Sequence, residues 1–163
     1  MHEIINKLPK LVKDKHKENK VFFNKLKKRP PKQLDYLMQD LHDNEFQSTD
    51  CLKCANCCKT TGPLFTDKDV NRISKYLRLK APQFINNYLR FDEEGDYVLN
   101  TLPCVFLGED NFCSIYEVRP KACSEFPHTN RKKFYQITNL TLKNMTICPA
   151  AYNIVEALKK NVK

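Results

Sequence analysis

Four of the eight cysteines are crowded into one short segment, and thiolates at this density typically bind metal. The crowded segment reads Cys51-x2-Cys54-x2-Cys57-Cys58, and the others follow singly as Cys104, Cys113, Cys123 and Cys148. Side chains three residues apart on a tight turn point into one small volume, which is why C-x2-C recurs in zinc sites and iron-sulfur sites. We therefore predict that all eight cysteines are metal ligands.

The spacing fits two kinds of metal centre. Cys51, Cys54 and Cys57 reproduce the C-x2-C-x2-C run of ferredoxin-like proteins. Cys148-Pro149 reproduces the Cys-Pro that closes that run, although far along the sequence. Two zinc ions, each held by four thiolates, satisfy the same cysteines. The sequence favours an iron-sulfur cluster slightly and leaves zinc open.

Eight thiols divide naturally into two sets of four. Adjacent Cys57 and Cys58 are expected to project in different directions, so that one of them serves a second site or bridges two metals. The most economical division gives one site Cys51, Cys54, Cys57 and Cys148. The other site then receives Cys58, Cys104, Cys113 and Cys123. The sequence does not fix this division.

The compartment decides whether thiols or disulfides are expected. The first residues contain no uninterrupted apolar stretch and no small-residue cleavage site, so we expect no signal peptide. The ~20 consecutive apolar residues that a membrane helix needs are absent from the sequence. We therefore expect a cytoplasmic protein with reduced thiols and no membrane partner. A disulfide framework, a redox dithiol and buried thiols that only fill space are the alternatives.

One histidine and three basic residues are candidates to assist the cysteines. His128 follows Cys123 closely enough to be a ligand or a hydrogen-bond donor to one, although a structural histidine is the simpler interpretation. Hydrogen bonds to sulfur could come from Arg119, Lys121 and Arg131. The remaining histidines are expected to be solvated: His2, His16 and His42. No residue is identified as catalytic, and the sequence does not decide whether the protein is an enzyme.

The positive charge is concentrated at the start of the chain. Of the net charge of +9, residues 1–33 contribute +8. Such a segment could contact an acidic partner or nucleic acid. Its only aromatic residues, Phe22 and Phe23, are adjacent rather than interleaved as stacking platforms, so a solvated basic helix is the better interpretation. We do not expect nucleic acid to be the partner, and no protein partner is identified.

The basic residues are predicted to lie on helices. Apolar residues recur at a helical period up to Leu26, interrupted by Pro9, and Arg29-Pro30-Pro31 ends this one long helix or two short ones. A second amphipathic helix follows over residues 34–41. We assign residues 1–45 to a basic helical extension and residues 46–163 to a cysteine-cluster metal-binding domain.

Local signals predict further helices after the cysteine cluster. Thr66 and Asp69 match a capping box at the start of one helix. Pro82 and Pro149 suit the first turns of two others, the second of which is C-terminal. Pro120 begins a short turn that carries Cys123. Helices are therefore expected to predominate.

A β-hairpin is expected beside the single cysteines. Residues 104–107 and 112–116 are apolar and flank the turn-forming run from Gly108 to Asn111. Residues 97–99 are expected to form another strand. The predicted fold class is α+β and mainly helical: a small cysteine-rich metal-binding domain with one β-hairpin and an N-terminal helical extension.

Five spaced motifs together resemble those of a known family. They are Cys51-x2-Cys54-x2-Cys57-Cys58, Cys104-Val105-Phe106-Leu107, Cys113-Ser114-Ile115-Tyr116, Arg119-Pro120-Lys121-Ala122-Cys123 with Phe126-Pro127, and Cys148-Pro149. Over about residues 51–152 the chain resembles the YkgJ family of cysteine-cluster proteins, also described as a zinc- or iron-chelating CxxCxxCC domain. The resemblance implies metal chelation by these cysteines and assigns no reaction.

Two positions depart from the pattern of that family. Ala55 stands where glycine commonly follows the second cysteine, which is expected to tighten the turn without removing a ligand. Ser124 stands where an arginine often follows the cysteine of Arg-Pro-x-x-Cys. Any role of that arginine is therefore not transferred to this chain.

Three functions are compatible with these residues. The main expectation is a cytosolic metal-binding protein that chelates iron, as an iron-sulfur cluster, or zinc through its eight cysteines, with no reaction assigned. The second is a zinc-structured interaction module whose basic helices bind an acidic partner or nucleic acid. The third is a metal delivery or storage protein.

Overall fold

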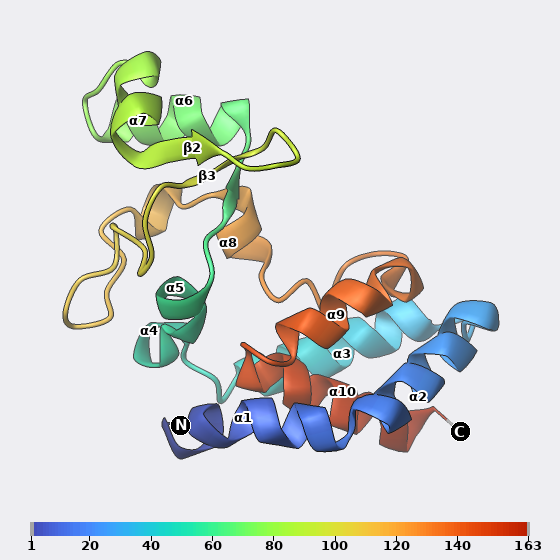
Figure 1. The fold of residues 1–163 in the computed structure, drawn as a ribbon. Helices are drawn as coiled ribbons and strands as arrows, with labels where there is room; N and C mark the ends of the chain where they lie inside the picture. Colours follow the sequence, from blue (N-terminus) through green and yellow to red (C-terminus); the bar gives the residue numbers. More distant parts are fainter. Residues whose placement is uncertain (1, 163) are drawn as a thin grey trace. The chain divides into compact units, whose positions relative to one another are not determined.

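The structure, a computed structural model, describes residues 2–162, with side chains from residue 4 onward. The chain forms two compact units. Residues 1–50 and 127–163 form the helical unit, and residues 51–126 form the cysteine unit. Helices predominate and a small antiparallel sheet accompanies them, which confirms the predicted mainly helical α+β class (Figure 1).

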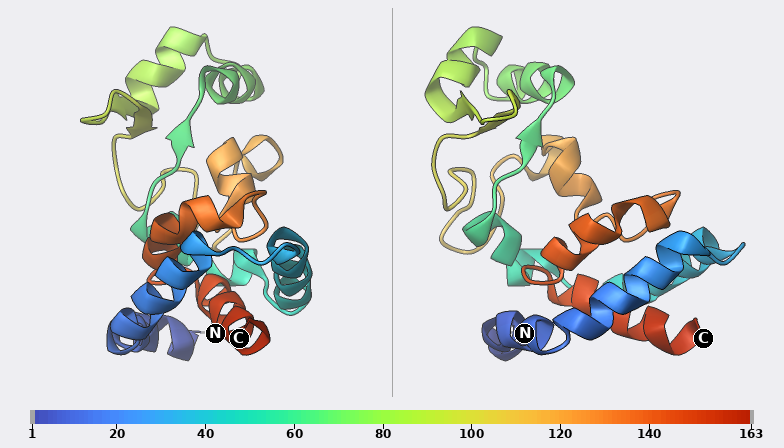
Figure 2. Two further views of the ribbon diagram at one scale, coloured as in Figure 1. Left: turned by 90° about the vertical axis from the view of Figure 1, so that its right-hand side faces the viewer. Right: turned by 45° about the vertical axis from the view of Figure 1, so that its right-hand side comes forward.

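The helical unit combines elements from both ends of the chain. In chain order they are α1 (His2–Asp14), α2 (His16–Lys28), α3 (Leu34–Phe46), a 3-10 helix (Phe134–Ile137), α9 (Thr138–Asn144) and α10 (Pro149–Asn161). The most extensive contact joins α3 to α10, and α1 also packs on α10. Figure 2 shows the C-terminal helices lying among the N-terminal ones. The predicted C-terminal helix after Cys148 is confirmed as α10.

The first two helices break at a different residue from the predicted one. Periodicity places the interruption at Pro9, but Pro9 lies inside α1, and the break falls at Lys15. Leu8 and Val12 on either side of Pro9 are both buried, so their packing outweighs the backbone hydrogen bond that proline removes. The predicted end at Arg29 is confirmed.

One apolar core joins the two segments of the helical unit. Its buried members include Leu8, Val12, Phe23, Leu26, Leu34, Met38, Phe134, Met145, Ile154, Val155 and Leu158. Residues 127–163 therefore complete the packing of the N-terminal helices. The predicted division into domains at residues 1–45 and 46–163 stays a prediction, and the compact units divide the chain at other positions.

A charged network connects α2 and the Lys15 junction with α10. Lys15 Nζ lies 2.5 Å from Glu156 Oε2, and Lys159 Nζ lies 2.6 Å from Glu156 Oε1. Lys159 also donates to Glu18 Oε1 at 2.5 Å and to Asn19 Oδ1 at 2.9 Å. Burial opposes ionisation of Glu156, but hydrogen bonds from Lys15 and Lys159 outweigh it and lower the pKa of the carboxyl group. The hydrogen bond to Glu156 raises the pKa of Lys15.

Neutralising Glu156 is expected to destabilise the protein in a pH-dependent way. At about pH 7, Glu156→Gln should lower the free energy of unfolding by about 2 kcal/mol, because two partly buried ammonium groups lose their anion. A carboxyl pKa that is lower in the folded state stabilises the fold above the unfolded value of 4.5, and this stabilisation disappears as pH falls through the folded value. The difference between the two proteins should therefore shrink below pH 4.5.

Urea unfolding followed by far-ultraviolet circular dichroism, repeated across this pH range, measures the difference. Glu94→Gln is the matched control, because Glu94 is exposed in a turn of the cysteine unit and its loss should cost less than about 0.5 kcal/mol. A stability difference for Glu156→Gln that stays constant into the acid range would contradict the assigned role of the carboxylate.

The cysteine unit contains short helices and one sheet. Its elements are α4 (Cys51–Cys54), α5 (Asn56–Thr60), β1 (Leu64–Phe65), α6 (Asp67–Tyr76), α7 (Ala81–Tyr88), β2 (Leu89–Phe91), β3 (Tyr97–Leu99), a 3-10 helix (Tyr116–Val118) and α8 (Lys121–Glu125). The predicted strand over residues 97–99 and the capping box at Thr66 are confirmed. None of the helices within residues 2–162 is long and apolar enough to cross a membrane.

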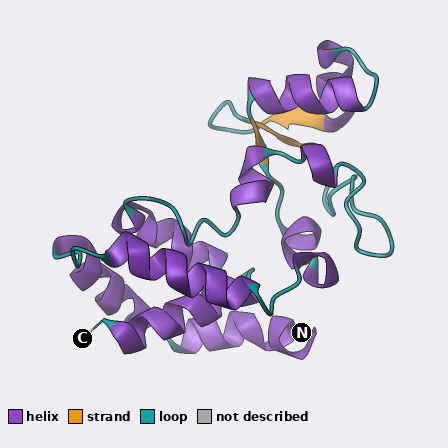
Figure 3. Cartoon of the chain, turned by 180° about the vertical axis from the view of Figure 1, so that it is seen from behind, coloured by secondary structure: helices purple, strands orange, loops and turns teal. Residues whose placement is uncertain are grey.

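The sheet is antiparallel, with strand order β1-β3-β2. In the central strand, Val98 pairs with Leu64 on one side and with Arg90 on the other. Figures 1 and 3 show α6 and α7 together on one side of the sheet. The core between them contains Phe65, Val70, Ile73, Phe84, Leu89, Leu99, Phe106 and Ile115.

The β-hairpin lies earlier in the sequence than predicted. Strands β2 and β3 form it, whereas the predicted hairpin over residues 104–116 contains only one isolated bridge, between Leu107 and Cys113. The Cys104 N–H donates to the Cys58 carbonyl at 2.8 Å, so this donor is not available for a strand partner. A 3-10 helix begins at Tyr116 and stops the second strand from extending.

Candidate metal centre

The clustered cysteines lie on two short helices joined by Ala55. Cys51 and Cys54 are the first and last residues of α4, and Cys57 and Cys58 lie in α5. The Ala55 N–H donates to the Cys51 carbonyl at 2.8 Å and closes the first turn. Cys51 is exposed, whereas the other three side chains are half-buried. The local fold thus gathers four thiols within eight residues.

Ala55 itself has a left-handed backbone. Its φ is 49° and its ψ is 14°, and the residue is buried. This conformation costs a residue with a Cβ atom roughly 1 kcal/mol of conformational free energy, whereas glycine adopts it without steric cost. This geometry accounts for the glycine that is common at this position in the family resembled.

Cys57 and Cys58 do not diverge as the sequence predicts. Their Sγ atoms lie 4.0 Å apart. Two sulfurs bound to one tetrahedral metal, with bonds of about 2.3 Å, are about 3.8 Å apart. The two thiols are therefore spaced to share one metal ion or to connect two neighbouring ones.

The irregular segment after β3 adds two thiols beside Cys58. The Cys104 backbone is hydrogen-bonded to that of Cys58, and Cys113 follows nine residues later in the isolated bridge with Leu107. Both side chains are half-buried and pack on the apolar core of the cysteine unit. Although no regular hairpin forms, the segment still holds both thiols against the core.

Cys123 lies in α8, whose first residue is held by α6. Asp69 Oδ1 accepts from the Lys121 N–H at 3.1 Å and from Arg72 Nη2 at 2.6 Å. The same Arg72 nitrogen donates to the Arg119 carbonyl at 2.8 Å. Asp69 is 1% exposed, so this hub is fixed inside the unit. It sets the position from which α8 presents its thiol.

Four thiols from these segments interact electrostatically with one another: Cys58, Cys104, Cys113 and Cys123. Burial raises the pKa of Cys104 to about 11 and the pKa of Cys123 to about 12. Burial also raises the pKa of Cys113. The hydrogen bond with Cys57, followed by burial, raises the pKa of Cys58. Ionising this set requires a cation close by.

The donor chemistry of the set fits a thiophilic metal. Four thiolates are the ligands of many structural zinc sites and of iron-sulfur clusters. Within residues 2–162, no three His, Cys, Asp or Glu side chains are already arranged around one metal position. Binding would therefore draw the thiols together and release their protons.

A family model matches residues 50–146, which is more than half of the chain. Its description is CxxCxxCC, "putative zinc- or iron-chelating domain". The chain belongs to the CxxCxxCC family. The matched CxxCxxCC segment contains seven of the eight cysteines, and Cys148 follows just after it.

A curated relative also aligns with this chain. "Uncharacterized protein MJ0661" of Methanocaldococcus jannaschii is 33% identical over 82 residues. The alignment covers 48% of this chain and 44% of that protein, so this chain spans less than half of the relative's length. No solved structure matches the chain.

Cys148 lies in the helical unit, unlike the seven cysteines of the CxxCxxCC segment. It is the N-cap of α10, and its Sγ accepts from the Ala151 N–H at 3.5 Å. Its side chain is half-buried against the helical core. Its assignment as a ligand with the first three clustered cysteines stays a prediction.

Arg119 is a basic residue placed to act on the CxxCxxCC thiols, as Lys59 is beside Cys58. Its guanidinium group lies 4.0 Å from the centroid of the Tyr116 ring and donates to the Tyr116 carbonyl at 2.7 Å. Its positive charge favours the thiolate forms of Cys113 and Cys123. Lys121 instead forms a surface ion pair with Glu125, at 3.6 Å.

The histidines and Arg131 lie outside the cysteine unit. His16 is exposed, as predicted. His42 is not simply solvated: its Nδ1 lies 2.8 Å from Thr129 Oγ1, and burial lowers its pKa. His128 has a left-handed backbone with φ 65°. The His2 side chain lies outside the described side chains, and Arg131 is exposed in the helical unit.

Sequence reasoning identified Asp69 as a helix cap and missed its second role. The capping box is present, with Asp69 N–H donating to Thr66 Oγ1 and Thr66 N–H donating back to Asp69 Oδ2. The hydrogen bond from the Lys121 N–H to Asp69 joins residues 52 positions apart, so no local sequence pattern predicts it. The sequence signal that could have indicated this role is an arginine, Arg72, three residues after the capping carboxylate of Asp69.

Proposed function

We propose that this CxxCxxCC protein binds iron or zinc through cysteine thiolates, with Cys58, Cys104, Cys113 and Cys123 forming one centre. The 2.8 Å hydrogen bond from the Cys104 N–H to the Cys58 carbonyl carries the proposal, because it holds the irregular segment that contains Cys104 and Cys113 against α5 although these residues lie far apart in sequence. Besides burial, neighbouring thiols help to raise the pKa of Cys123 in α8. The bound metal would supply the positive charge that four thiolates require. Arg119 contributes further positive charge at two of them.

Cys51, Cys54, Cys57 and Cys148 form the proposed second set. The Sγ distance of 4.0 Å between Cys57 and Cys58 supports a connection between the two sets. We favour an iron-sulfur cluster, because the C-x2-C-x2-C run and the Cys148-Pro149 pair match cluster ligation, and two zinc ions are the alternative. A reducing cytoplasm is the proposed setting, since ligation needs thiols rather than disulfides.

Metal loading is proposed to stabilise the cysteine unit. The cysteines of this unit lie in helices of four or five residues and in an irregular segment, outside its longer helices α6 and α7. A tight structural zinc site supplies on the order of 10 kcal/mol of folding free energy. Chelation should therefore loosen residues 51–126 before it affects the helical unit, whose core is separate.

The test is the metal content of protein purified without oxygen. Iron, zinc and acid-labile sulfide are measured per chain together with the visible absorption spectrum. Brown protein with matched iron and sulfide identifies an iron-sulfur protein. Colourless protein with about two zinc ions per chain identifies two four-thiolate zinc sites. Protein that holds neither metal after reconstitution with iron and sulfide, or with zinc, would contradict the proposal.

A further inference from the structure

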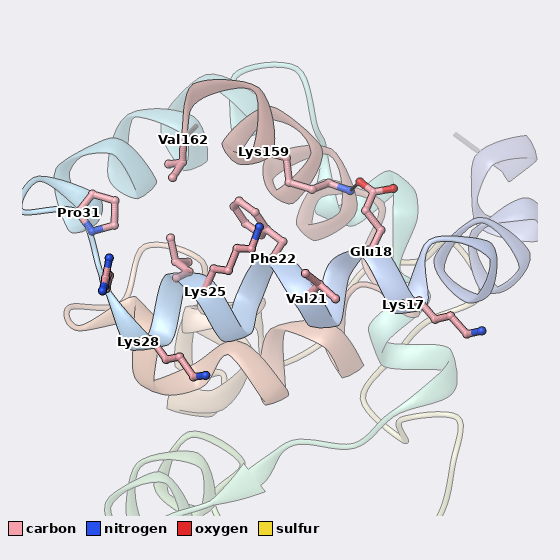
Figure 4. Close-up of a pocket in the computed structure, with 11 residues that line it drawn as sticks. Lys17, Glu18, Val21, Phe22, Lys25, Lys28, Pro31, Lys159 and Val162 are labelled. Carbon is pink, nitrogen blue, oxygen red and sulfur yellow. Dashed lines mark hydrogen bonds and ion pairs between the residues drawn. The ribbon is translucent and has the colours of Figure 1, made fainter.

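The helical unit has an open groove along the outer face of α2. Its volume is about 980 Å³. The apolar lining consists of Val21, Phe22, Leu26, Pro31 and Val162. Figure 4 shows α2 on one side, and Lys159 and Val162 of the C-terminal segment on the other. Val21 is 56% exposed, so the floor offers apolar surface that is open to a partner.

The groove has a strongly basic rim. Its charged residues are Lys17, Lys25, Lys28, Arg29 and Lys159, against a single carboxylate, Glu18. Lys159 pairs with Glu18 and with Glu156. Within residues 2–162, Lys17, Lys25 and Lys28 form no ion pair with another side chain. An apolar floor is thus bordered by cations whose charge is not balanced locally.

The apolar surface continues beyond the end of α2. A second hollow shares Pro31 and Val162 with the groove and extends onto α3, where Leu37 and Tyr36 line it. Tyr36 is 77% exposed. The combined surface is therefore an elongated strip rather than a closed cavity for a small molecule.

We propose that this groove binds an acidic amphipathic helix of a partner protein. The lining residues on α2 run from Lys17 to Lys28, a distance of about 17 Å at 1.5 Å per residue. This length matches about three turns of a docked helix. Such a helix would place apolar residues at positions i, i+3 or i+4, and i+7 over Val21 and Phe22. Its flanking carboxylates would pair with Lys25 and Lys28.

The same features argue against other occupants. A second copy of this chain would bring an identical basic rim against the first, and like charges across an interface are unfavourable. Single-stranded nucleic acid needs a series of aromatic faces on which successive bases stack, whereas Phe22 in the groove and Tyr36 in the adjoining hollow are the aromatic rings that line this strip among the described residues. An acidic amphipathic helix can make apolar contacts with the floor and ion pairs with the basic rim.

The proposal is tested with a fluorescent synthetic helix and the full-length protein. The probe is a peptide of about 15 residues that carries leucines along one face and glutamates beside them. A peptide of the same composition, with the leucines scattered around the helix, is its control. Fluorescence polarisation should show saturable binding of the first peptide with a Kd of about 10 μM, and at least tenfold weaker binding of the second.

Two variants locate the binding. Lys25→Glu with Lys28→Glu should weaken binding at least about tenfold, because rim attraction becomes repulsion. Lys68→Glu with Lys75→Glu makes the same charge change on exposed positions of α6, and should alter the Kd less than about twofold. Val21→Asp should weaken binding by removing apolar contact with the floor of the groove. Circular dichroism checks that each variant is folded.

Four outcomes would overturn the proposal. These are equal binding of the two peptides, undiminished binding in the Lys25 and Lys28 variant, no saturation up to about 1 mM peptide, and a short single-stranded RNA that binds more tightly than the peptide. The result does not depend on the metal proposal, because the groove lies in the helical unit and metal content is measured on the same samples.

Discussion

Cys123→Ser is expected to lower the affinity for zinc, or for reconstituted iron and sulfide, at least about 100-fold, because even residues that only support a metal ligand contribute 10- to 100-fold. Serine nearly preserves the volume of the side chain but is a poor ligand for these metals. Competition with a coloured chelator measures the zinc affinity. Visible absorption reports loss of a cluster.

Ser124→Ala is the matched control for this substitution. Ser124 is the next residue of α8, is exposed, and its hydroxyl group donates only to the Lys121 carbonyl, at 2.9 Å. Its removal should leave the metal content unchanged. Wild-type affinity in Cys123→Ser would show that this thiol is not a ligand, and the four-thiol centre would then lose its support.

Asp69→Ala is expected to destabilise the cysteine unit by about 3 kcal/mol. The substitution removes the acceptor of the Thr66, Arg72 and Lys121 hydrogen bonds from a site that is 1% exposed. Burial opposes ionisation of Asp69, but these hydrogen bonds outweigh it and lower the pKa of the carboxyl group. Because the hub also holds the start of α8, the substitution should weaken metal binding as well.

Urea unfolding monitored by circular dichroism, with metal content measured on the same protein, tests this expectation. Asp67→Ala is the control, since Asp67 is the exposed first residue of the same helix and should contribute only about 0.5 kcal/mol through the helix dipole. If Asp69→Ala were no more destabilising than Asp67→Ala, the proposed link between α6 and α8 would be wrong.

Local signals in the sequence predicted the helices well. The capping box at Thr66 and the prolines near the starts of α7 and α10 act within a few residues, so they are readable without the fold. Pro9 gave the wrong position for the helix break. The backbone hydrogen bond that proline removes is a local loss, whereas the burial of Leu8 and Val12 that offsets it depends on residues far along the chain.

The site was predicted less completely than the helices. Cysteine spacing pointed to the thiols, and the structure joins the backbones of Cys58 and Cys104 by a hydrogen bond, although residues 104–116 form no regular hairpin. The short distance between the Cys57 and Cys58 sulfurs follows from the conformation of α5, which spacing alone does not specify. The bond between Asp69 and Lys121 depends on how α6 meets α8, which is a tertiary property.

The interruption of the helical unit by residues 51–126 has a consequence during synthesis. The apolar face of α3 packs on α10, but α10 leaves the ribosome only after the whole cysteine unit. At 5–20 residues per second, the roughly 100 residues between α3 and α10 take about 5–20 s to translate. For that time the side chains of α3 that later pack on α10 lack their partner, while the seven thiols of the cysteine unit leave the ribosome before Cys148.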